Sequence, residues 1–441
     1  MKVIVLGAGI IGVSTAWHLL NEGHEVTVVD RQPDAALETS FANGAQISVS
    51  FCEPWANAGA PLKVAKWLLR DDSPLLFRPR LDPHQWRWGL SFLTQCNDAA
   101  FERNVRQLVA LGRYSHESLK QLVAATGIEY QRLERGILHF FSSKADFEAG
   151  AAGAELMRRY GVDRRVLGRD EVLKIEPALA AFGARIHGGT FTPSDESGDA
   201  QVFTQQLAAL CRARGATFLH DTAVDRLDAL GGQISGVRVR HVPDGTARTL
   251  VADQYVAAMG SHTAPLLRRL GIWLNIYPAK GYSATLRLKR PDDASVVSLL
   301  DDTRKIAISR LGDHIRIAGT AELAGYDSSL DSATARKRCA ALVRRYEELF
   351  PGVADTTEPN YWTGLRPSTP TNIPYIGRST LPNLWLNAGH GTLGWTHGAG
   401  SGQALAELIS GKRPALSFGF CGEVLPAARP FVGGKPGLEQ G

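Results

Sequence analysis

Three glycines near the start of the chain have the spacing that binds the pyrophosphate of a dinucleotide. The first permits a tight turn, the second lets the main chain approach the phosphates, and the third allows a helix to pack closely on a strand. The N-terminus of that helix offers free N–H groups and the positive end of its dipole to the phosphates. The spacing therefore predicts a dinucleotide site at the run Gly7-Ala8-Gly9-Ile10-Ile11-Gly12.

An acidic residue follows at the position where such sites hold the adenosine ribose. Asp30 comes 18 residues after Gly12, and its carboxylate can accept hydrogen bonds from ribose hydroxyls. The same carboxylate would repel the 2′-phosphate of NADP, although the neighbouring Arg31 weakens that argument. The motif alone leaves the choice between NAD and FAD open.

These residues need a strand, a helix and a second strand to position them. Residues 3–6 and 25–30 are short apolar runs typical of buried strands, and residues 10–22, ended by Gly23, are expected to be helical. This βαβ opening predicts a parallel sheet covered by helices. Downstream patterns predict strands at 136–141, 216–220, 234–240 and 250–258, a hairpin of 304–309 with 314–318, and helices at 101–126 (one or a pair), 199–214 and 332–350.

Composition excludes several classes of protein. The 441 residues carry 49 Lys and Arg against 44 Asp and Glu, a net charge of +5, which does not indicate a nucleic-acid binder. The five cysteines are odd in number and form no C-x-x-C pair, so we expect neither a disulfide framework nor a zinc site, and we expect a reducing, cytoplasmic compartment. Because polar residues interrupt every long apolar run, we also expect no membrane-spanning helix.

Residues 54–100 combine aromatic and basic side chains. They hold four of the nine tryptophans, with six Lys and Arg residues between them. One interpretation is an insertion whose tryptophans fill a core. The other is a surface that meets an electron acceptor or lies peripherally on the cytoplasmic face of the inner membrane, because Trp and Phe beside Lys and Arg suit a lipid interface.

Several downstream segments resemble the FAD-dependent amino-acid oxidoreductases related to D-amino-acid oxidase, glycine oxidase and sarcosine oxidase. Within that family they are most similar to the bacterial D-amino acid dehydrogenases, from residue 1 to about residue 418. The segments that carry the resemblance are Glu38-Thr39-Ser40, Asn43 to Ser48, Gly198-Asp199, Ala258 to Ser261, Gly364-Leu365-Arg366-Pro367, and Gly389 to Thr396.

This resemblance implies an α/β fold with a Rossmann-like FAD-binding domain and an α+β substrate domain that has an antiparallel sheet over the flavin. It implies that residues 1–50, 190–270 and 355–441 build the FAD domain, and that residues 51–189 and 271–354 build the substrate domain. It also implies the FAD contacts, at Ser40, Asn43, Gly44, Gln46, Ile47, Val224 and Gly260 and in the loop Gly391-Thr392-Leu393-Gly394-Trp395-Thr396.

The resemblance also implies the groups that meet the substrate. Arg366 occupies the position whose guanidinium faces the substrate carboxylate, a match of two parallel hydrogen bonds, with a structural salt bridge as the alternative. Tyr282 and Tyr375 could donate to the same carboxylate, and Lys280 could hold a water near the ring. His390 is either a base or a hydrogen-bond partner of a residue nearby. Because Cys339 is expected on a helix face and Cys421 in the tail, we expect FAD to be non-covalent.

The implied reaction is the oxidative deamination of a D-amino acid, D-alanine-like in its side chain, to a 2-oxo acid and ammonia. Electrons would pass through FAD to a quinone or another acceptor. Three alternatives stay open at this point: an oxidase of the same fold that uses oxygen on D-amino acids, glycine, sarcosine or D-hydroxyproline; a flavin-binding sensor or assembly subunit without turnover; and a nicotinamide dehydrogenase.

Overall fold

The first half of the fold is a six-stranded sheet that begins with the predicted βαβ unit. The structure, a computed structural model, describes residues 1–62 and 74–422. The strands of this sheet are parallel except at one edge, where β19 runs against β20. Their order is β19 (Tyr375–Arg378), β20 (Leu384–Ala388), β13 (Gln254–Ala257), β1 (Lys2–Leu6), β2 (Glu25–Val29) and β9 (Thr217–Leu219).

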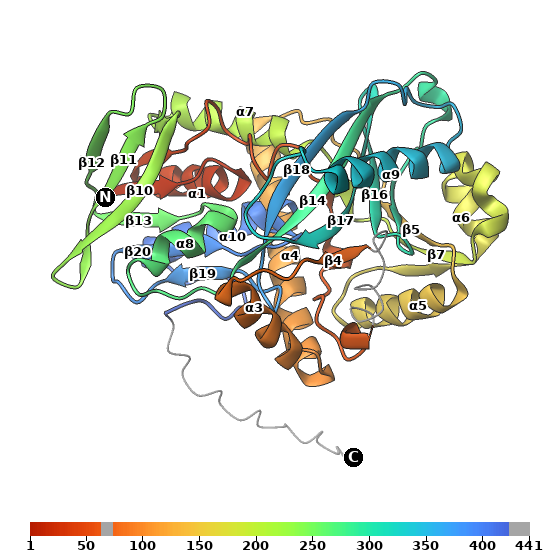
Figure 1. Cartoon of the computed structure of the whole chain (residues 1–441), viewed down its shortest axis with the longest axis horizontal. Helices are drawn as coiled ribbons and strands as arrows, with labels where there is room; N and C mark the ends of the chain where they lie inside the picture. The colour runs from red at the N-terminus through yellow and green to blue at the C-terminus, as the bar shows by residue number, and fades with distance from the viewer. Residues whose placement is uncertain (63–73, 423–441) are drawn as a thin grey trace, which may run out of the picture.

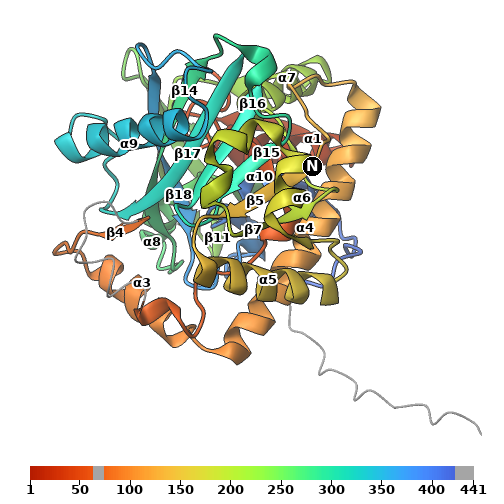
Figure 2. The same cartoon turned by 90° about the vertical axis from the view of Figure 1, so that its right-hand side faces the viewer.

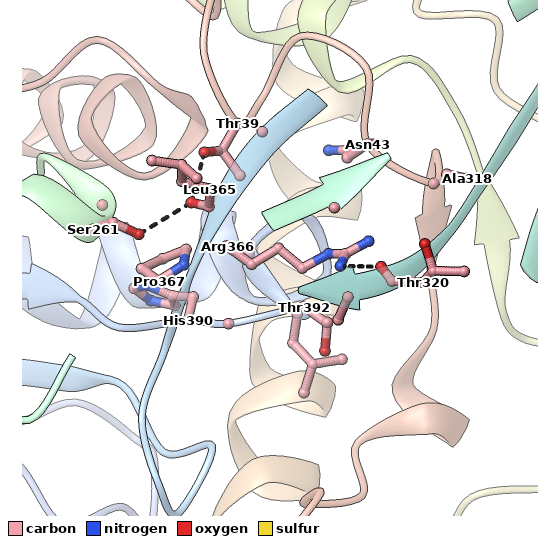
Figure 3. A pocket seen from close by; sticks show the side chains of 18 of the residues that line it. Thr39, Asn43, Ser261, Ala318, Thr320, Leu365, Arg366, Pro367, His390 and Thr392 are labelled. Atoms are coloured by element: carbon pink, nitrogen blue, oxygen red, sulfur yellow. Dashed lines mark hydrogen bonds between the residues drawn. The ribbon is translucent and has the colours of Figure 1, made fainter. Parts of the chain in front are cut away.

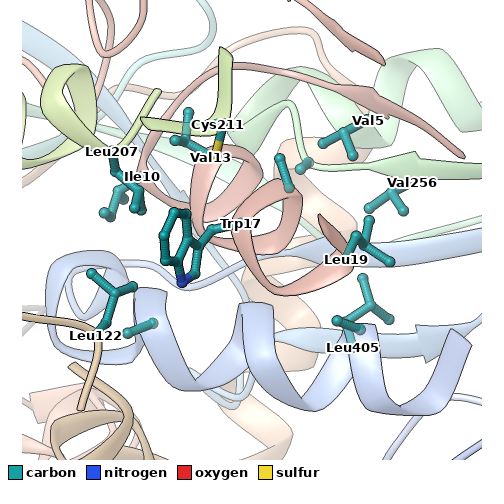
Figure 4. Packing of buried hydrophobic residues seen from close by; sticks show 14 of the residues in the cluster. Val5, Ile10, Val13, Trp17, Leu19, Leu122, Leu207, Cys211, Val256 and Leu405 are labelled. Atoms are coloured by element: carbon teal, nitrogen blue, oxygen red, sulfur yellow. The ribbon is translucent and has the colours of Figure 1, made fainter. Parts of the chain in front are cut away.

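Both faces of this sheet are buried, because successive side chains of a strand point to opposite sides. Val3 and Val5 pack with the helices on one face. Figure 4 shows Trp17 on this face, beside the helix formed by residues 394–409. Ile4 and Leu6 pack on the other face. The first face is covered by α1 (Ile10–Asn21), α7 (Ala200–Ala213) and α10 (Gly394–Ile409), and the second by α8 (Thr263–Arg268) and a small sheet of β10 (Thr222–Leu230), β11 (Gln233–His241) and β12 (Ala247–Leu250).

The second half is a nine-stranded, mainly antiparallel sheet (Figure 1). One face of it is covered by α9 (Ala333–Leu349), which packs on Tyr282, Ala284 and Leu286 of β14. Its strands are β18 (Asn360–Ser368), β14 (Tyr277–Arg287), β17 (His314–Leu323), β16 (Ile306–Leu311), β15 (Ser298–Asp301), β5 (Ile137–Phe141), β7 (Gly188–Thr192) and β6 (Arg165–Leu167), with β4 (Leu75–Phe77) beside β17.

Helices complete the outside of this half. The view in Figure 2 looks onto α5 and α6, which lie over the β5–β7 end of the sheet. The remaining elements are α3 (Pro83–Thr94), α4 (Asp98–Thr126), α5 (Lys144–Arg159), α6 (Arg169–Ile175), the two-stranded pair β3 (Gln46–Ile47) and β8 (Glu196–Ser197), and short 3-10 helices at Val49–Phe51, Pro177–Arg185, Gly260–His262 and Pro291–Asp293.

Most predicted elements are present, with different bounds. The predicted helix over 101–126 is one helix that begins at Asp98, where the Asn97 side chain accepts a hydrogen bond from Ala100 N. Asp199 caps α7 as expected, and the hairpin at 304–318 is β16 with β17. The segment 250–258 does not form one strand, because β12 ends at Leu250 and β13 begins only at Gln254.

Two segments pack with a different sheet from the one in the domain assignment that the resemblance implies. Residues 360–368 were expected in the FAD domain, but β18 pairs with β14 along its whole length, from Tyr277↔Ser368 to Thr285↔Asn360. These backbone hydrogen bonds make β18 the edge of the antiparallel sheet. Conversely, α4 was expected in the substrate domain, but Leu111 and Leu119 pack into the core beneath the parallel sheet. The rest of the two-domain division stays a prediction.

The aromatic and basic segment at 54–100 is partly core and partly surface. Trp88 is buried, stacks on Phe92 and donates a hydrogen bond to Ser368 O at 2.8 Å. Trp86, in contrast, is 50% exposed. In the described parts of the chain, no helix is both long and apolar enough to cross a bilayer. Lys63, Lys66, Trp67 and Arg70 lie outside the described residues, as does the tail from 423 onward.

Candidate active site

A cavity of about 3000 Å³ runs between the two large sheets and joins the two groups of predicted site residues. One end lies at the glycine run and Asp30, and the other at Arg366 and His390. The predicted cofactor residues on its wall are Gly7, Gly9, Ile10, Ile11, Asp30, Arg31, Ser40, Asn43, Gly44, Gln46, Val224, Gly260, Gly391, Thr392, Leu393, Gly394, Trp395 and Thr396. Ala8, Gly12 and Ile47 are not part of this wall.

The glycine run forms the turn from β1 into α1. Gly7 has a φ of +107°, which L side chains rarely adopt. A Cβ at Gly12 would collide with the Gly7 carbonyl oxygen, so this glycine allows α1 to start directly behind the turn. Gly9 is the N-cap of α1 and has no side chain to cap it. Free N–H groups and open space beside the helix N-terminus fit a bound pyrophosphate.

Asp30 ends β2 beside this turn. Its Oδ2 accepts a hydrogen bond from Ala8 N at 2.6 Å, and its Oδ1 accepts one from Gln32 N at 2.9 Å. Burial raises the pKa of this carboxyl above its usual value, even though both hydrogen bonds act to lower it. The carboxylate is thereby fixed at the cavity wall, where it suits a ribose hydroxyl. Arg31 turns away from it and forms an ion pair with Glu38 at 2.5 Å.

The loop before α10 faces the middle of the cavity. α10 begins at Gly394, and its N-cap, Leu393, makes no side-chain capping hydrogen bond. The positive end of a second helix therefore lies on the cavity wall, where it suits a negatively charged group. Thr396 Oγ1 accepts a hydrogen bond from Ser48 N at 3.1 Å, which ties this loop to segment 40–48. Two helix N-termini meet this cavity, and neither is capped by the side chain of its own N-cap residue, an arrangement that fits FAD.

Segment 40–48 connects the nucleotide end to the antiparallel sheet. Ser40 Oγ accepts a hydrogen bond from Ile10 N at 3.0 Å, next to the glycine turn. Further along, Gln46 Nε2 donates to Ser298 Oγ at 2.9 Å, and Gly44 O accepts from Ser309 Oγ at 2.9 Å. Ile47 is fully buried behind the wall, so it supports the segment rather than facing a cofactor.

Arg366, in β18, extends into the other end of the cavity (Figure 3). Its Nη1 donates a hydrogen bond to Thr320 O at 2.7 Å. Among residues 1–62 and 74–422, no carboxylate forms an ion pair with it, which argues against the structural salt bridge. Burial lowers its pKa to about 10, so the guanidinium stays charged at neutral pH. A charged group in such a place needs an anion, because an unpaired buried charge is costly.

The polar groups of Lys280 and Tyr282 point to the opposite face of the sheet. The predictions that Lys280 holds a water near the ring and that Tyr282 donates to the carboxylate do not fit these positions. Ala279 is the residue opposite Arg366 in the β14–β18 register, so the even-numbered residues of β14 face away from Arg366. Tyr282 donates its hydroxyl proton to Glu322 Oε2 at 2.5 Å, and Lys280 Nζ donates to Ser329 O at 2.5 Å. Only part of Tyr282 reaches the cavity wall.

Tyr375 is also misplaced by the sequence-based prediction. It lies in β19, at the edge of the six-stranded sheet, and its hydroxyl accepts a hydrogen bond from Asn275 N at 3.2 Å. Its ring packs against the buried group of Ala264, Ile276 and Ala388. It does not line the cavity, so a hydrogen bond to a substrate carboxylate is excluded by its position.

His390 does line the cavity, and it is 2% exposed. Neither of its ring nitrogens has a hydrogen-bond partner among the described residues. Burial, together with the nearby His397, lowers its pKa well below the usual value, so the ring is neutral at neutral pH. Both nitrogens are themselves buried, so the neutral imidazole is a packed part of the wall and is not turned to the open cavity.

Sequence reasoning missed the residues that hold the strand of Arg366. The carbonyl of Leu365 accepts hydrogen bonds from Thr39 Oγ1 at 3.0 Å and from Ser261 Oγ at 3.1 Å (Figure 3). Both hydroxyls belong to segments that resemble the family, which was the available signal. Thr320, whose carbonyl contacts Arg366, lies in no such segment, so the sequence held no signal for its role.

The cysteines do not approach the cavity. Cys339 is buried in the core between α9 and the antiparallel sheet, and Cys421 lies beside β19. Neither is on the cavity wall. A non-covalent mode of FAD binding remains a prediction that fits these positions.

Comparisons with known proteins agree with this geometry. The chain is 50% identical over 420 residues to a D-amino acid dehydrogenase of Dechloromonas aromatica (strain RCB), covering 95% of this chain and 99% of the relative. It is 45% identical over 417 residues to a D-amino acid dehydrogenase of Methylobacterium nodulans, covering 95% of this chain and 97% of that one.

Solved structures show the same fold at low sequence identity. Glycine oxidase from Bacillus cereus ATCC 14579 matches with a TM-score of 0.69 and 21% identity, over 94% of this chain and 96% of that chain. L-proline dehydrogenase from P. horikoshii matches with a TM-score of 0.71 and 18% identity, over 94% of both chains. The sequence model of the family described as DAO, FAD dependent oxidoreductase, matches residues 2–408. With a glycine turn suited to a dinucleotide and the guanidinium of Arg366 on the wall of one cavity, this chain belongs to the FAD-dependent oxidoreductases of the DAO family.

Proposed function

We propose that the chain is an FAD-dependent D-amino acid dehydrogenase. The observation that carries this proposal is Arg366, a partly buried guanidinium in the cavity that has a main-chain carbonyl, and no described carboxylate, as its partner. An α-amino acid supplies the missing carboxylate, and a guanidinium can hold it through two parallel hydrogen bonds. The names of the relatives, at 50% and 45% identity over nearly the whole chain, support D-amino acids as the substrate class.

The protein's part in the reaction is to orient the substrate and to stabilise charge. Bound FAD supplies the acceptor for the hydride that leaves the substrate Cα. Arg366 fixes the carboxylate, and His390, neutral and buried, is part of the cavity wall. The N-terminus of α10, on the cavity wall, would stabilise negative charge on the bound cofactor. The imino acid product then hydrolyses to a 2-oxo acid and ammonia.

An anaerobic reduction screen tests this function. The purified protein is mixed with D- and L-amino acids without oxygen, and bleaching of the flavin absorbance is followed. We expect bleaching by D-amino acids, with D-alanine-like substrates the fastest. A flavoprotein that no amino acid bleaches would be a sensor or assembly subunit instead, and one bleached only by L-amino acids would contradict the proposed stereochemistry.

We further propose a quinone as the electron acceptor. The reduced protein is then mixed with oxygen or with a water-soluble quinone, and the rates of flavin reoxidation are compared. Faster reoxidation by the quinone is expected for a dehydrogenase. Faster reoxidation by oxygen would make the protein an oxidase of the same fold.

We also propose that the surface around α3 touches a membrane. Leu81, Trp86, Leu90 and Leu93 are exposed there by 50% or more. The adjacent Trp273, 54% exposed, lies beneath the guanidinium groups of Arg87 and Arg268. Exposed apolar side chains next to cations suit an anionic lipid interface.

Vesicle sedimentation tests this contact. We expect the protein to pellet with vesicles of phosphatidylglycerol and phosphatidylcholine, and the variant Trp86→Ser/Leu90→Ser to stay in the supernatant. Binding that is unchanged in this variant would remove α3 from the contact. The variant Val166→Ser, a substitution at an exposed apolar residue of β6, serves as the control.

A further inference from the structure

The guanidinium of Arg366 lies against a glycine of the neighbouring strand. A Cβ atom added at Gly281 would lie 2.5 Å from Nη2 and 2.6 Å from Nη1 of Arg366, closer than atoms approach without displacement. Both strands are held in place by the β14–β18 hydrogen bonds, where Gly281 is opposite Gly364. The guanidinium therefore occupies space that exists because residue 281 has no side chain.

On the other side of Gly281, strand β17 has an irregularity. The β14–β17 register pairs Lys280 with Glu322 but Tyr282 with Gly319, so two residues of β17 oppose Gly281 alone. This is a β-bulge, a feature that bends a strand and redirects its groups. The two bulged residues are Thr320 and Ala321.

The backbone of Thr320 is strained in this bulge. Its φ is +57°, in the left-handed region, which is unfavourable for a β-branched residue. Its carbonyl accepts the Nη1 hydrogen bond of Arg366 at 2.7 Å, and its own hydroxyl has no hydrogen-bond partner among the described residues. Strained backbone at such a place persists only where the surrounding structure enforces it, and it is often found at functional sites.

We propose that Gly281 and the bulge at Thr320 are positioning residues for the substrate carboxylate. The Thr320 carbonyl holds one nitrogen of Arg366, and the bare Cα of Gly281 lets the guanidinium lie over strand β14. Arg366 Nε and Nη2, which have no hydrogen-bond partner in the described chain, are left for the carboxylate. This inference rests on the proposed function, because it gives Gly281 and Thr320 a role only through Arg366.

A double-mutant cycle tests whether Gly281 acts through Arg366. KM and kcat for D-alanine are measured for Gly281→Ala, Arg366→Ala and the double variant, each with its FAD content. We expect Gly281→Ala to raise KM about tenfold, with a smaller change in kcat, and to change KM less than about twofold in the Arg366→Ala background. Equal effects in both backgrounds would overturn the inference, because Gly281 would then serve only the fold.

The inhibition constant of propionate, which is D-alanine without its amino group, gives a second readout that needs no turnover. We expect this inhibition constant to change in parallel with KM across the wild type, the two single variants and the double variant. The control Gly168→Ala, at an exposed glycine whose added Cβ would make only an ordinary 3.6 Å contact, should leave both constants unchanged. If Gly281→Ala does not fold, recovery of a folded flavoprotein on adding Arg366→Ala supports the same clash, and no recovery contradicts it.

Thr320 is tested separately. Proline at 320 fixes φ near −65° and turns the carbonyl away, whereas glycine can keep the left-handed turn. We expect Thr320→Pro to raise KM and the propionate constant more than Thr320→Gly does. Equal constants in the two variants would remove Thr320 from the inference. If Arg366→Ala leaves KM and the inhibition constant of propionate unchanged, the proposed function of Arg366 is wrong. If Gly281→Ala has the same effect with and without Arg366, only the inference about Gly281 is wrong.

Discussion

At the nucleotide end of the cavity the chain presents a glycine turn beside the carboxylate of Asp30, whereas at the substrate end it presents the guanidinium of Arg366. The first end is a turn and a helix start within six consecutive residues, Gly7 to Gly12. The second end combines Arg366 of β18, Gly281 of β14 and Thr320 of β17, which are far apart in the sequence. The nucleotide end therefore depends on glycines that leave the main chain open, and the substrate end depends on the contacts that hold the Arg366 side chain.

The largest effect is expected from filling the cofactor end. Gly9→Val places a branched side chain at the N-terminus of α1, where an added Cβ already lies 3.3 Å from Ser40 Oγ. We expect the purified variant to lose its FAD, measured as flavin absorbance per polypeptide. Gly168→Val is the matched control, at an exposed glycine. Full flavin content in Gly9→Val would remove this turn from the cofactor site.

The next effect is expected at the substrate end. Arg366→Ala removes the charged hydrogen bonds to the carboxylate, each worth about 1.5–3 kcal/mol, so KM for a D-amino acid should rise about 100-fold or more. FAD should stay bound, because Arg366 is not part of the nucleotide turn. Arg366→Lys keeps the charge but not the two parallel N–H donors, so its KM should lie between those of the wild type and Arg366→Ala. Loss of flavin from Arg366→Ala would mean that the two ends are not separable.

A pH dependence follows from the same arginine. Burial lowers the pKa of Arg366 to about 10, so its charge is present below that pH and is lost as pH rises through it. We expect the inhibition constant of propionate to be constant up to about pH 9 and then to rise about tenfold per pH unit above about pH 10. Flavin content at each pH controls for unfolding. A constant that is flat beyond about pH 11 would contradict this pKa.

The smallest effect on catalysis is expected at Tyr282, which lies on the far face of the substrate sheet. Tyr282→Phe removes the hydrogen bond to Glu322, so the midpoint temperature of unfolding should fall, in line with about 1–3 kcal/mol for an unsatisfied buried acceptor. KM for a D-amino acid should change less than about twofold. A tenfold rise in KM would place the hydroxyl in the substrate site after all.

The two ends also differ in how far the sequence alone predicts them. The nucleotide turn could be predicted because its residues are consecutive and each glycine has a steric reason. The position of Arg366 followed from a family resemblance. The side to which Lys280 and Tyr282 point could not be predicted, because shifting the strand register by one residue exchanges the two faces of a strand.

Long-range features escaped prediction for the same reason. Tyr375 follows the segment of Arg366 closely in sequence, but it belongs to β19 in the other sheet. The bulge at Thr320 depends on which residues of β14 it meets, and no local pattern marks it. In contrast, the hairpin of β16 and β17 was predicted, because the alternation of apolar residues around Gly312 is local.

The carbonyl of Leu365 links the two ends. Thr39, from the segment that follows the nucleotide turn, and Ser261, from the loop after β13, both donate to this one oxygen, directly before Arg366. The strand of the arginine is thus tied through one atom to a segment of the nucleotide side and to a loop of the parallel sheet. A substitution that removes either hydroxyl should therefore affect the setting of Arg366 as well as the segment that carries the hydroxyl.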